Sequence, residues 1–106
     1  MKFAAIATLS LLSLVSAPAL ADEAQLARGK ELFMSKAVPA CAVCHTMADA
    51  GSKGAIGPNL DELKPDAARI MKVLNEGMGA MPAFKATLNP ADMAAVTAYV
   101  VKATSK

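Results

Sequence analysis

The most informative segment of this 106-residue chain is Cys41-Ala42-Val43-Cys44-His45. It contains both cysteines of the sequence and its single histidine. Thiols and imidazoles bind soft metal centres and carry thiol chemistry, and here all three lie on one short segment. Two thiols separated by two residues and followed at once by an imidazole form the pattern C-x-x-C-H, which is the attachment site for haem of the c type.

The spacing of this motif has a physical basis. Cys41 and Cys44 can each add to one vinyl group on the same edge of a porphyrin, which gives one haem c held by two thioether bonds. His45 then projects its imidazole over the ring face, where it can bind the iron. Because His45 is the only histidine of the chain, no other imidazole competes for this role.

Three other roles are open to the cysteine pair. A thioredoxin-like redox site carries C-x-x-C after a strand of a βαβ unit, and no strand is predicted before Cys41. A zinc site needs four ligands, whereas the chain offers only these three soft ones. A structural disulfide between Cys41 and Cys44 would close a short strained loop and leave His45 without a role. Each explains less of the motif than haem attachment does.

A methionine is the expected second axial ligand, because imidazole and thioether together make a low-spin electron carrier of raised potential. Met47 lies two residues from His45 and cannot reach the opposite ring face. The methionines at positions 34, 71 and 93 lie in predicted helices and are more simply core or surface residues. This leaves two methionines of one loop.

These two are Met78 and Met81, and we choose Met81 as the ligand. Pro82 keeps the residue before it extended, which projects the Met81 side chain out of the loop. Gly77 and Gly79 allow the backbone to come close to a flat ring. Met78 remains the alternative ligand.

Helical periodicity continues on both sides of the motif. Residues 22–36 are expected to form a first helix with Gly29 on its apolar stripe, and residues 60–63 a single turn. A further helix is predicted to start at Pro65 and to end at Gly77, following the preference for proline at a helix start and glycine at its end.

The last helix has the clearest start signal. Asn89 is a good cap, Pro90 fits the first helical position, and Asp92 is placed for a reciprocal capping contact. Residues 46–58 should form an irregular loop, and no run alternates as a strand would. The predicted fold is therefore all-α.

The first 21 residues have the layout of a cleaved signal peptide. Lys2 precedes an apolar run over residues 3–15, and residues 19–21 (Ala-Leu-Ala) would fit a cut before Asp22. The run is shorter than the ~20 residues of a membrane span, so the mature form is expected to lack one. An uncleaved N-terminal anchor is the alternative. The expected mature domain comprises residues 22–106, and export would place it in the periplasm.

Composition excludes several classes of partner. The chain has a net charge of +2, and Lys2 is its only charged residue before position 22, which leaves +1 for the mature domain. Nucleic-acid-binding domains and proteins bound to anionic lipid carry clustered basic charge, so neither partner is expected. Only three aromatic side chains, Phe33, Phe84 and Tyr99, remain to fill a core, so something else is expected to fill the middle.

With these residues in view, the chain resembles the class I monohaem cytochromes c of the bacterial periplasm. The resemblance covers essentially the whole mature chain. It rests on residues 29–33 (GKELF), 41–46 (CAVCHT), 57–60 (GPNL), 81–84 (MPAF) and 98–100 (AYV).

The resemblance implies a small cytochrome c fold, with three main helices around one covalently attached haem. It implies that the first and last helices cross at Gly29, with Phe33 and Tyr99 packed at the contact. It also implies that the backbone carbonyl of Pro58 accepts a hydrogen bond from the His45 Nδ1–H, which orients the ring and raises its basicity. The contacts of the haem propionates do not carry over. Arg69 and Lys72 are candidates for these contacts, although solvated helix charges are the simpler interpretation of both residues.

The expected function is electron transport by a carrier that is not an enzyme, because His45 and Met81 would leave the iron no open position. Its partners would be periplasmic dehydrogenases, oxidases or reductases, met as a monomer in transient complexes. The expected docking rim is small and uncharged and consists of Ala37, Val38, Pro39, Ala40, Gly79, Ala80, Pro82 and Ala83. Lys36, Lys53 and Lys85 are expected as outer steering charges.

Two other functions remain open. The protein could be the cytochrome subunit of a periplasmic oxidoreductase, such as a sulfite-type dehydrogenase, held in a stable complex. It could also be a haem sensor or peroxidase in which Met81 dissociates and opens the iron.

Overall fold

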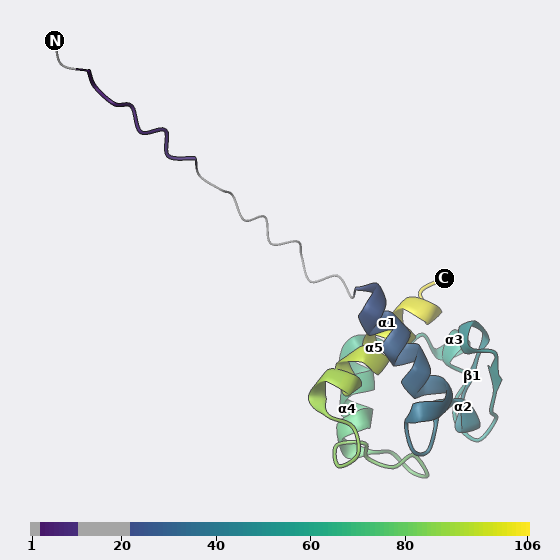
Figure 1. Cartoon of the computed structure of the whole chain (residues 1–106). Coiled ribbons are helices and arrows are strands. Elements are labelled where there is room, and N and C mark those ends of the chain that lie inside the picture. Colours follow the sequence, from purple (N-terminus) through teal and green to yellow (C-terminus); the bar gives the residue numbers. More distant parts are fainter. Residues whose placement is uncertain (1–2, 11–21) are drawn as a thin grey trace.

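The computed structural model describes residues 3–10 and 22–106 of the chain. Residues 3–10 form no helix or strand and are exposed. The predicted cleavage site at residues 19–21 lies outside the described residues. In chain order the domain consists of α1 (Glu23–Glu31), η1 (Leu32–Lys36), α2 (Cys41–Cys44), β1 (Thr46–Met47), η2 (Ala48–Ala50), β2 (Ser52–Lys53), α3 (Leu60–Leu63), α4 (Ala67–Glu76) and α5 (Pro90–Thr104) (Figure 1).

The long helices begin where short polar side chains cap them. The side chains of Asp22, Asp66 and Asn89 each accept a hydrogen bond from the backbone N–H three residues later. Helix α4 therefore begins at Ala67 rather than at Pro65, because Asp66 occupies the cap position. It ends at Gly77 as predicted, where φ is +72°.

The first predicted helix changes its winding part-way. Helix α1 continues into η1, a short π-helix in which the Ala37 N–H bonds to the Leu32 carbonyl, five residues back, at 3.1 Å. The wider turn still buries Leu32 and Phe33. The predicted span is thus observed, with a change in hydrogen-bond register that periodicity alone does not reveal.

Asp92 does not make the reciprocal capping contact predicted for it. Its two carboxylate oxygens instead accept hydrogen bonds from the Arg28 guanidinium of α1, at 3.1 and 3.2 Å. The capping contact was predicted from neighbouring residues alone. Asp92 instead pairs with Arg28, 64 residues away in sequence, because the two helices cross there. The bidentate pair ties the start of α5 to α1.

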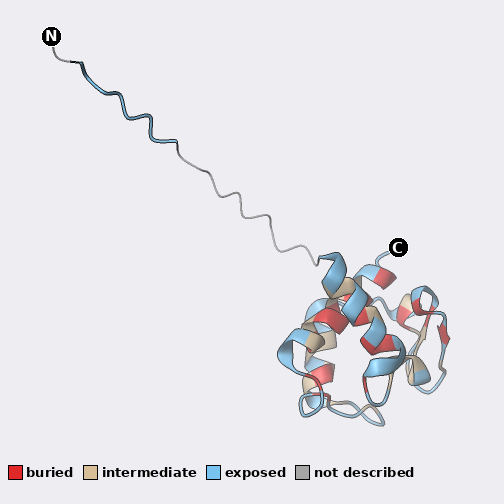
Figure 2. Ribbon diagram, in the orientation of Figure 1, coloured by how far each residue is buried: buried red, intermediate tan, exposed pale blue. Residues whose placement is uncertain are grey.

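Helices α1 and α5 cross in close contact (Figure 1). Gly29 of α1 lies at this contact, against Ala95 and Tyr99 of α5. A Cβ atom at Gly29 would lie 2.1 Å from the Ala95 carbonyl oxygen and 2.7 Å from the Tyr99 Cβ. Beside the crossing, the rings of Phe33 and Tyr99 pack edge to face with their centroids 5.9 Å apart. Figure 2 shows buried residues concentrated where these helices meet. The crossing expected from the resemblance is therefore present.

The segment 46–58 is more ordered than the irregular loop predicted for it. Strands β1 and β2 pair antiparallel, with Thr46 opposite Lys53 and Met47 opposite Ser52. The Ser52 hydroxyl also accepts the Met47 N–H at 3.0 Å. Each strand has only two residues, too few for the alternation by which a strand is predicted. The expectation of no strand was wrong for this hairpin, while the domain remains mainly helical.

Two carboxylates fix the hairpin region to the helices. The Tyr99 hydroxyl of α5 donates to Asp49 at 2.5 Å, and Lys30 of α1 lies 3.6 Å from the same carboxylate oxygen. The tyrosine hydrogen bond, with the charge of Lys30, holds the pKa of Asp49 below its usual range. Asp61 of α3 accepts the Ala48 N–H at 2.8 Å. Within residues 3–10 and 22–106, no helix is long and apolar enough to cross a membrane.

We expect Gly29→Ala to lower the free energy of unfolding by at least ~2 kcal/mol. Alanine has the higher helix propensity, but its methyl group would meet the Ala95 backbone, which cannot rotate away. Urea denaturation of the purified protein measures the effect. Gly51→Ala is the control: Gly51 has φ of +63° and open space around it, so it should cost only ~1 kcal/mol of backbone strain. An equal loss in both variants would contradict the crossing.

We expect Tyr99→Phe to destabilise the protein by ~1 kcal/mol at neutral pH through loss of the hydrogen bond to Asp49. Because the pKa of Asp49 is lowered in the folded state, its carboxylate stabilises the protein at pH values above the unfolded-state pKa of ~3.9. This stabilisation is lost as the pH falls through the folded-state pKa. The difference between wild type and variant should therefore shrink below about pH 4. Denaturation midpoints measured across pH 2.5–7 test this, and a difference independent of pH would contradict it.

Candidate functional site

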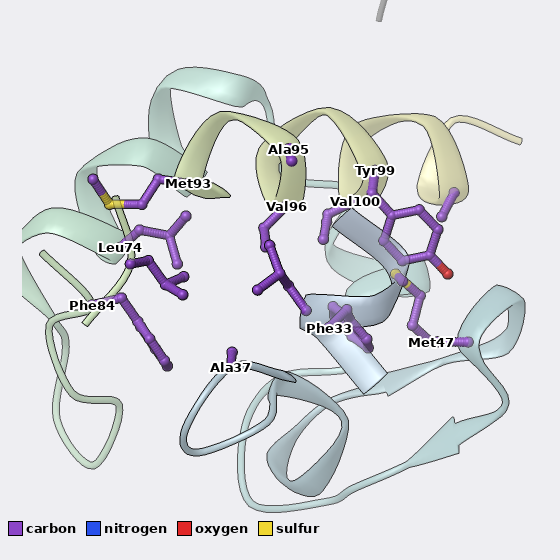
Figure 3. Close-up of a cluster of buried hydrophobic side chains, with 14 of the residues drawn as sticks. Phe33, Ala37, Met47, Leu74, Phe84, Met93, Ala95, Val96, Tyr99 and Val100 are labelled. Atoms are coloured by element: carbon purple, nitrogen blue, oxygen red, sulfur yellow. The ribbon is translucent and has the colours of Figure 1, made fainter. Parts of the chain in front are cut away.

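An apolar cavity of ≈ 330 Å³ lies at the centre of the helical domain. Its walls come from η1, α2, the segment 56–58, α3, α4, the loop 78–84 and α5. Most of the lining side chains are hydrocarbon, and Arg69 is the only Lys, Arg, Asp or Glu among them. Figure 3 shows Phe84 and Leu74 on one side of the core and Phe33 on the other, with Val96 above. The side chains therefore form a shell rather than a filled centre.

Both cysteines line this cavity. Cys41 and Cys44 begin and end the single turn of α2, and both are free thiols. Burial raises the pKa of the Cys41 thiol to about 11. A reactive redox cysteine needs the opposite, a lowered pKa that favours the thiolate. Helix α2 also follows η1 rather than a strand, so the thioredoxin interpretation lacks both its chemistry and its structural setting.

The His45 ring also lines the cavity and is held from behind. Its Nδ1 lies 2.8 Å from the carbonyl oxygen of Pro58, the contact that the resemblance implies. A Cβ at Gly57 would lie 2.6 Å from the ring Cε1, so the backbone there rests against the imidazole. The Gly57 N–H donates to the Cys44 carbonyl at 2.7 Å, and Thr46 Oγ1 donates to the Gly54 carbonyl at 2.8 Å. The loop 54–58 thus supports the C-x-x-C-H motif from behind. It occupies Nδ1 of His45 with the Pro58 carbonyl and leaves the other ring nitrogen, Nε2, without that contact.

Only two of the described methionines line the cavity, Met78 and Met81. Met47 and Met93 are buried in the core, and Met71 sulfur accepts a hydrogen bond from Thr97 at 3.1 Å. Met81 is partly buried against the core, whereas Met78 is 65% exposed. The cavity walls therefore contain the two methionines that the sequence left as candidates for the second axial ligand.

A tight turn carries these methionines. The N–H of Met78 donates to the Met81 carbonyl and that of Met81 to the Met78 carbonyl, each at 2.9 Å. Gly79 within the turn has φ of +57°, and a Cβ at Gly77 would lie 2.8 Å from the Met81 carbonyl oxygen. Both glycines are therefore required by the turn itself, through backbone conformation and close approach.

Among the described residues, no group of three or more His, Cys, Asp or Glu side chains could hold a metal ion. The zinc interpretation therefore finds no ligand set in that part of the chain. The motif, the cavity and the paired methionines leave a large planar apolar cofactor as the group that fits.

Comparison with known proteins agrees with this geometry. Residues 24–100 match the family described as "Cytochrome C oxidase, cbb3-type, subunit III". Cytochrome c6 of Synechocystis sp. is 35% identical in an alignment 91 residues long, which covers 78% of this chain and 69% of that protein. The chain belongs to the monohaem cytochrome c family. It is an electron-transfer protein that carries covalently bound haem c.

A solved structure supports the cytochrome c fold as well. The crystal structure of the c-type cytochrome SorU from Sinorhizobium meliloti aligns with a TM-score of 0.76 and 46% sequence identity. The alignment covers 80% of this chain and 97% of SorU. The predicted fold, a small cytochrome c fold with helices around one haem, is thereby confirmed.

The residues of this cytochrome fit haem c by their chemistry. A porphyrin needs apolar walls on both faces, and the lining supplies Phe33, Leu74, Phe84, Val96 and Val100 among others. The motif thiols lie in the same wall as His45, so sulfur and imidazole reach the cavity from one segment. Haem also explains how a domain with three aromatic side chains can have a stable core.

The docking rim predicted from the sequence needs one correction. Ala37 is only 2% exposed and belongs to the core, because the wide turn of η1 rotates it inward. The other rim residues are exposed, except for partly buried Ala40. Sequence reasoning missed Ile56 and Leu63, which line the cavity and are exposed at its edge. Ile56 lies in a glycine-rich segment, where apolar periodicity offers no signal.

We expect Gly57→Ala to displace the His45 ring of the cytochrome, because the new methyl group would clash with the ring Cε1. The measurement is the proton resonance of His45 Nδ1–H in the reduced protein, which should shift or exchange with solvent. Ala55→Ser is the control, since it adds one atom at an exposed residue of the same loop. An unchanged resonance in Gly57→Ala would contradict the positioning role.

Proposed function

We propose that this cytochrome is a periplasmic carrier of single electrons whose haem c is bound by Cys41 and Cys44 and ligated by His45 and Met81. The observation that carries the proposal is the joint presence of these four side chains in the walls of one apolar cavity. Each thiol would add across one vinyl group, so that sulfur bonds to carbon and the thiol hydrogen moves to the neighbouring carbon.

Support for His45 comes from its hydrogen bond to Pro58. With the Pro58 carbonyl 2.8 Å away, Nδ1 keeps its proton and Nε2 is left as the ligand atom. Support for Met81 comes from its partial burial, since the alternative Met78 is largely exposed. A His/Met ligand pair raises the reduction potential.

When bound, the haem supplies an iron that accepts and releases one electron. The chain contributes an apolar enclosure, which excludes water and limits the charge rearrangement that accompanies electron transfer. With His45 and Met81 both bound to iron, no position would remain for a substrate. This supports a carrier rather than an enzyme.

The partner face we propose surrounds the mouth of the cavity. Val38, Ile56 and Met78 are 77%, 73% and 65% exposed, and Ile56 and Met78 line the cavity itself. Lys36, Lys53 and Lys85 are exposed and form no ion pair among the described residues. An apolar contact with few charges favours brief complexes that depend little on salt.

Periplasmic location rests on the signal-peptide layout of residues 1–21. The alternative is that the protein is a stable subunit of an oxidoreductase. The description of the matching family, which names an oxidase subunit, supports this alternative. Gel filtration of the native periplasmic extract separates the two: a carrier elutes near the size of a small monomer, and a subunit elutes with its enzyme.

We expect Met81→Ala to abolish the absorption band of the iron–thioether bond and to let the reduced protein bind carbon monoxide. Met78→Ala is the matched control from the same turn and should keep the band. Both variants should keep two thioether bonds by mass and by the pyridine haemochrome spectrum. The reverse result would make Met78 the ligand, and a wild-type protein that binds carbon monoxide at neutral pH would favour a sensor or peroxidase.

We expect the electron self-exchange rate between oxidised and reduced copies to change less than about threefold between low and moderate ionic strength. NMR line broadening in mixtures of the two forms measures this rate. Ile56→Ser should slow exchange, whereas Met34→Ser, at an exposed residue outside the cavity walls, should not. A steep dependence on salt would refute an apolar contact.

A further inference from the structure

Tyr99 is the only phenol of the chain, which also contains no indole ring, so it is the one aromatic side chain that gives up an electron readily. It lies in α5 and is 5% exposed. Its hydroxyl donates a hydrogen bond to the Asp49 carboxylate at 2.5 Å. A phenol that loses an electron also releases its proton, and a base already in place speeds such a step. The pair thus combines an oxidisable ring with a proton acceptor.

At neutral pH each member of this pair is in the protonation state that such a step needs. Burial, together with the hydrogen bond to Asp49, raises the pKa of Tyr99, so the phenol keeps its proton. The same hydrogen bond and the charge of Lys30, whose Nζ lies 3.6 Å from Asp49 Oδ2, lower the pKa of the carboxyl. Asp49 is therefore an ionised base, and its exposure allows exchange of a proton with water.

The Tyr99 ring also contacts a wall of the haem cavity. It packs edge to face against Phe33 with the ring centroids 5.9 Å apart, and Phe33 lines the cavity. Tyr99 is not itself a lining residue, so its contact with the wall runs through the Phe33 ring. In Figure 3 the Tyr99 hydroxyl points away from Leu74 and Phe84 on the other side of the core. The ring is thus close to the cofactor, while its proton is held on the outer side.

We propose that Tyr99 and Asp49 form a second redox site of this cytochrome, which relays an electron from the reduced haem to a one-electron oxidant in the solvent, such as an organic peroxyl radical. The relay needs haem c in the cavity. It requires neither a particular axial ligand nor a particular redox partner, so it goes beyond the proposed carrier function.

The relay consists of two balanced steps. In the first, Tyr99 loses one electron to the peroxyl radical and its hydroxyl proton to Asp49, which leaves a tyrosyl radical and a neutral carboxylic acid. The reduced peroxyl group takes a proton from water and becomes a hydroperoxide. In the second step the reduced haem gives one electron to the tyrosyl radical, and Asp49 returns the proton. One radical, one proton and one haem electron are consumed, and Tyr99 and Asp49 are restored.

The test uses the holo protein and photogenerated ruthenium(III) tris-bipyridine as the one-electron oxidant. In the oxidised protein, whose haem has no such electron to give, freeze-quench EPR should show a tyrosyl radical. In the reduced protein this signal should be lost in step with a slower phase of haem oxidation, which follows direct oxidation at the cavity mouth. Absence of the radical in the oxidised protein would overturn the proposal, and so would a radical with equal lifetimes in both forms.

Two variants test the proton acceptor. Asp49→Asn keeps a hydrogen-bond acceptor but removes the base, so tyrosyl formation should slow by about tenfold or more. Asp61→Asn is the matched control, because it removes the same charge from a carboxylate that accepts the Ala48 N–H instead. Its rate should stay near that of wild type. Equal slowing in both variants would show only a general charge effect and overturn the role of Asp49, as would an unchanged rate in Asp49→Asn.

Tyr99→Phe should lose both the EPR signal and the slower phase of haem oxidation. If this variant does not mature, wild type with ring-deuterated tyrosine replaces it: the hyperfine pattern should narrow, and an unchanged pattern would assign the radical to another group and overturn the proposal. The iron–thioether band and the mass of the holo protein report separately on the proposed function. If these are normal while the radical tests fail, only the relay is wrong.

Discussion

Gly29 lets the backbones of α1 and α5 touch, and the central cavity depends on this contact. With the Ala95 carbonyl 2.1 Å from where a Cβ would stand, no larger residue fits without moving one helix. The Arg28–Asp92 pair and the Phe33–Tyr99 contact hold the crossing at either side. Phe33 of η1, which continues α1, and Val96 and Val100 of α5 also form part of the cavity wall.

A second set of contacts positions the loop behind His45. Asp49 accepts a hydrogen bond from the Tyr99 hydroxyl of α5, and Asp61 accepts one from the Ala48 N–H. Lys64 Nζ donates a hydrogen bond to the Thr104 carbonyl near the end of α5 at 3.0 Å. These contacts bind the segment 46–64 to the helical frame from several directions. The Pro58 carbonyl that faces His45 belongs to this segment, so the imidazole is oriented by the frame as a whole.

The fold and most of the candidate site could be predicted because their signals are local. Cys41, Cys44 and His45 are adjacent in sequence, and the Asn89 cap and the Gly77 stop follow from short-range backbone geometry. The predictions that failed concern features without a periodic or capping signal in the sequence. Asp92 pairs across a helix crossing, Ala37 turns inward through a change of helix register, and a two-residue strand pair gives no periodic signal.

Sequence alone determined the cofactor class, because only one common chemistry needs two thiols and an imidazole at this spacing. It also reduced the candidates for the second axial ligand from the six methionines beyond residue 21 to two, because one lies too near His45 and three lie in predicted helices. Only the tertiary structure shows which charged side chain of α4 lies in the cavity wall. Arg69 and Lys72 look alike on one helix, and only the packing of α4 against the rest of the domain brings one of them into the cavity wall and leaves the other outside it.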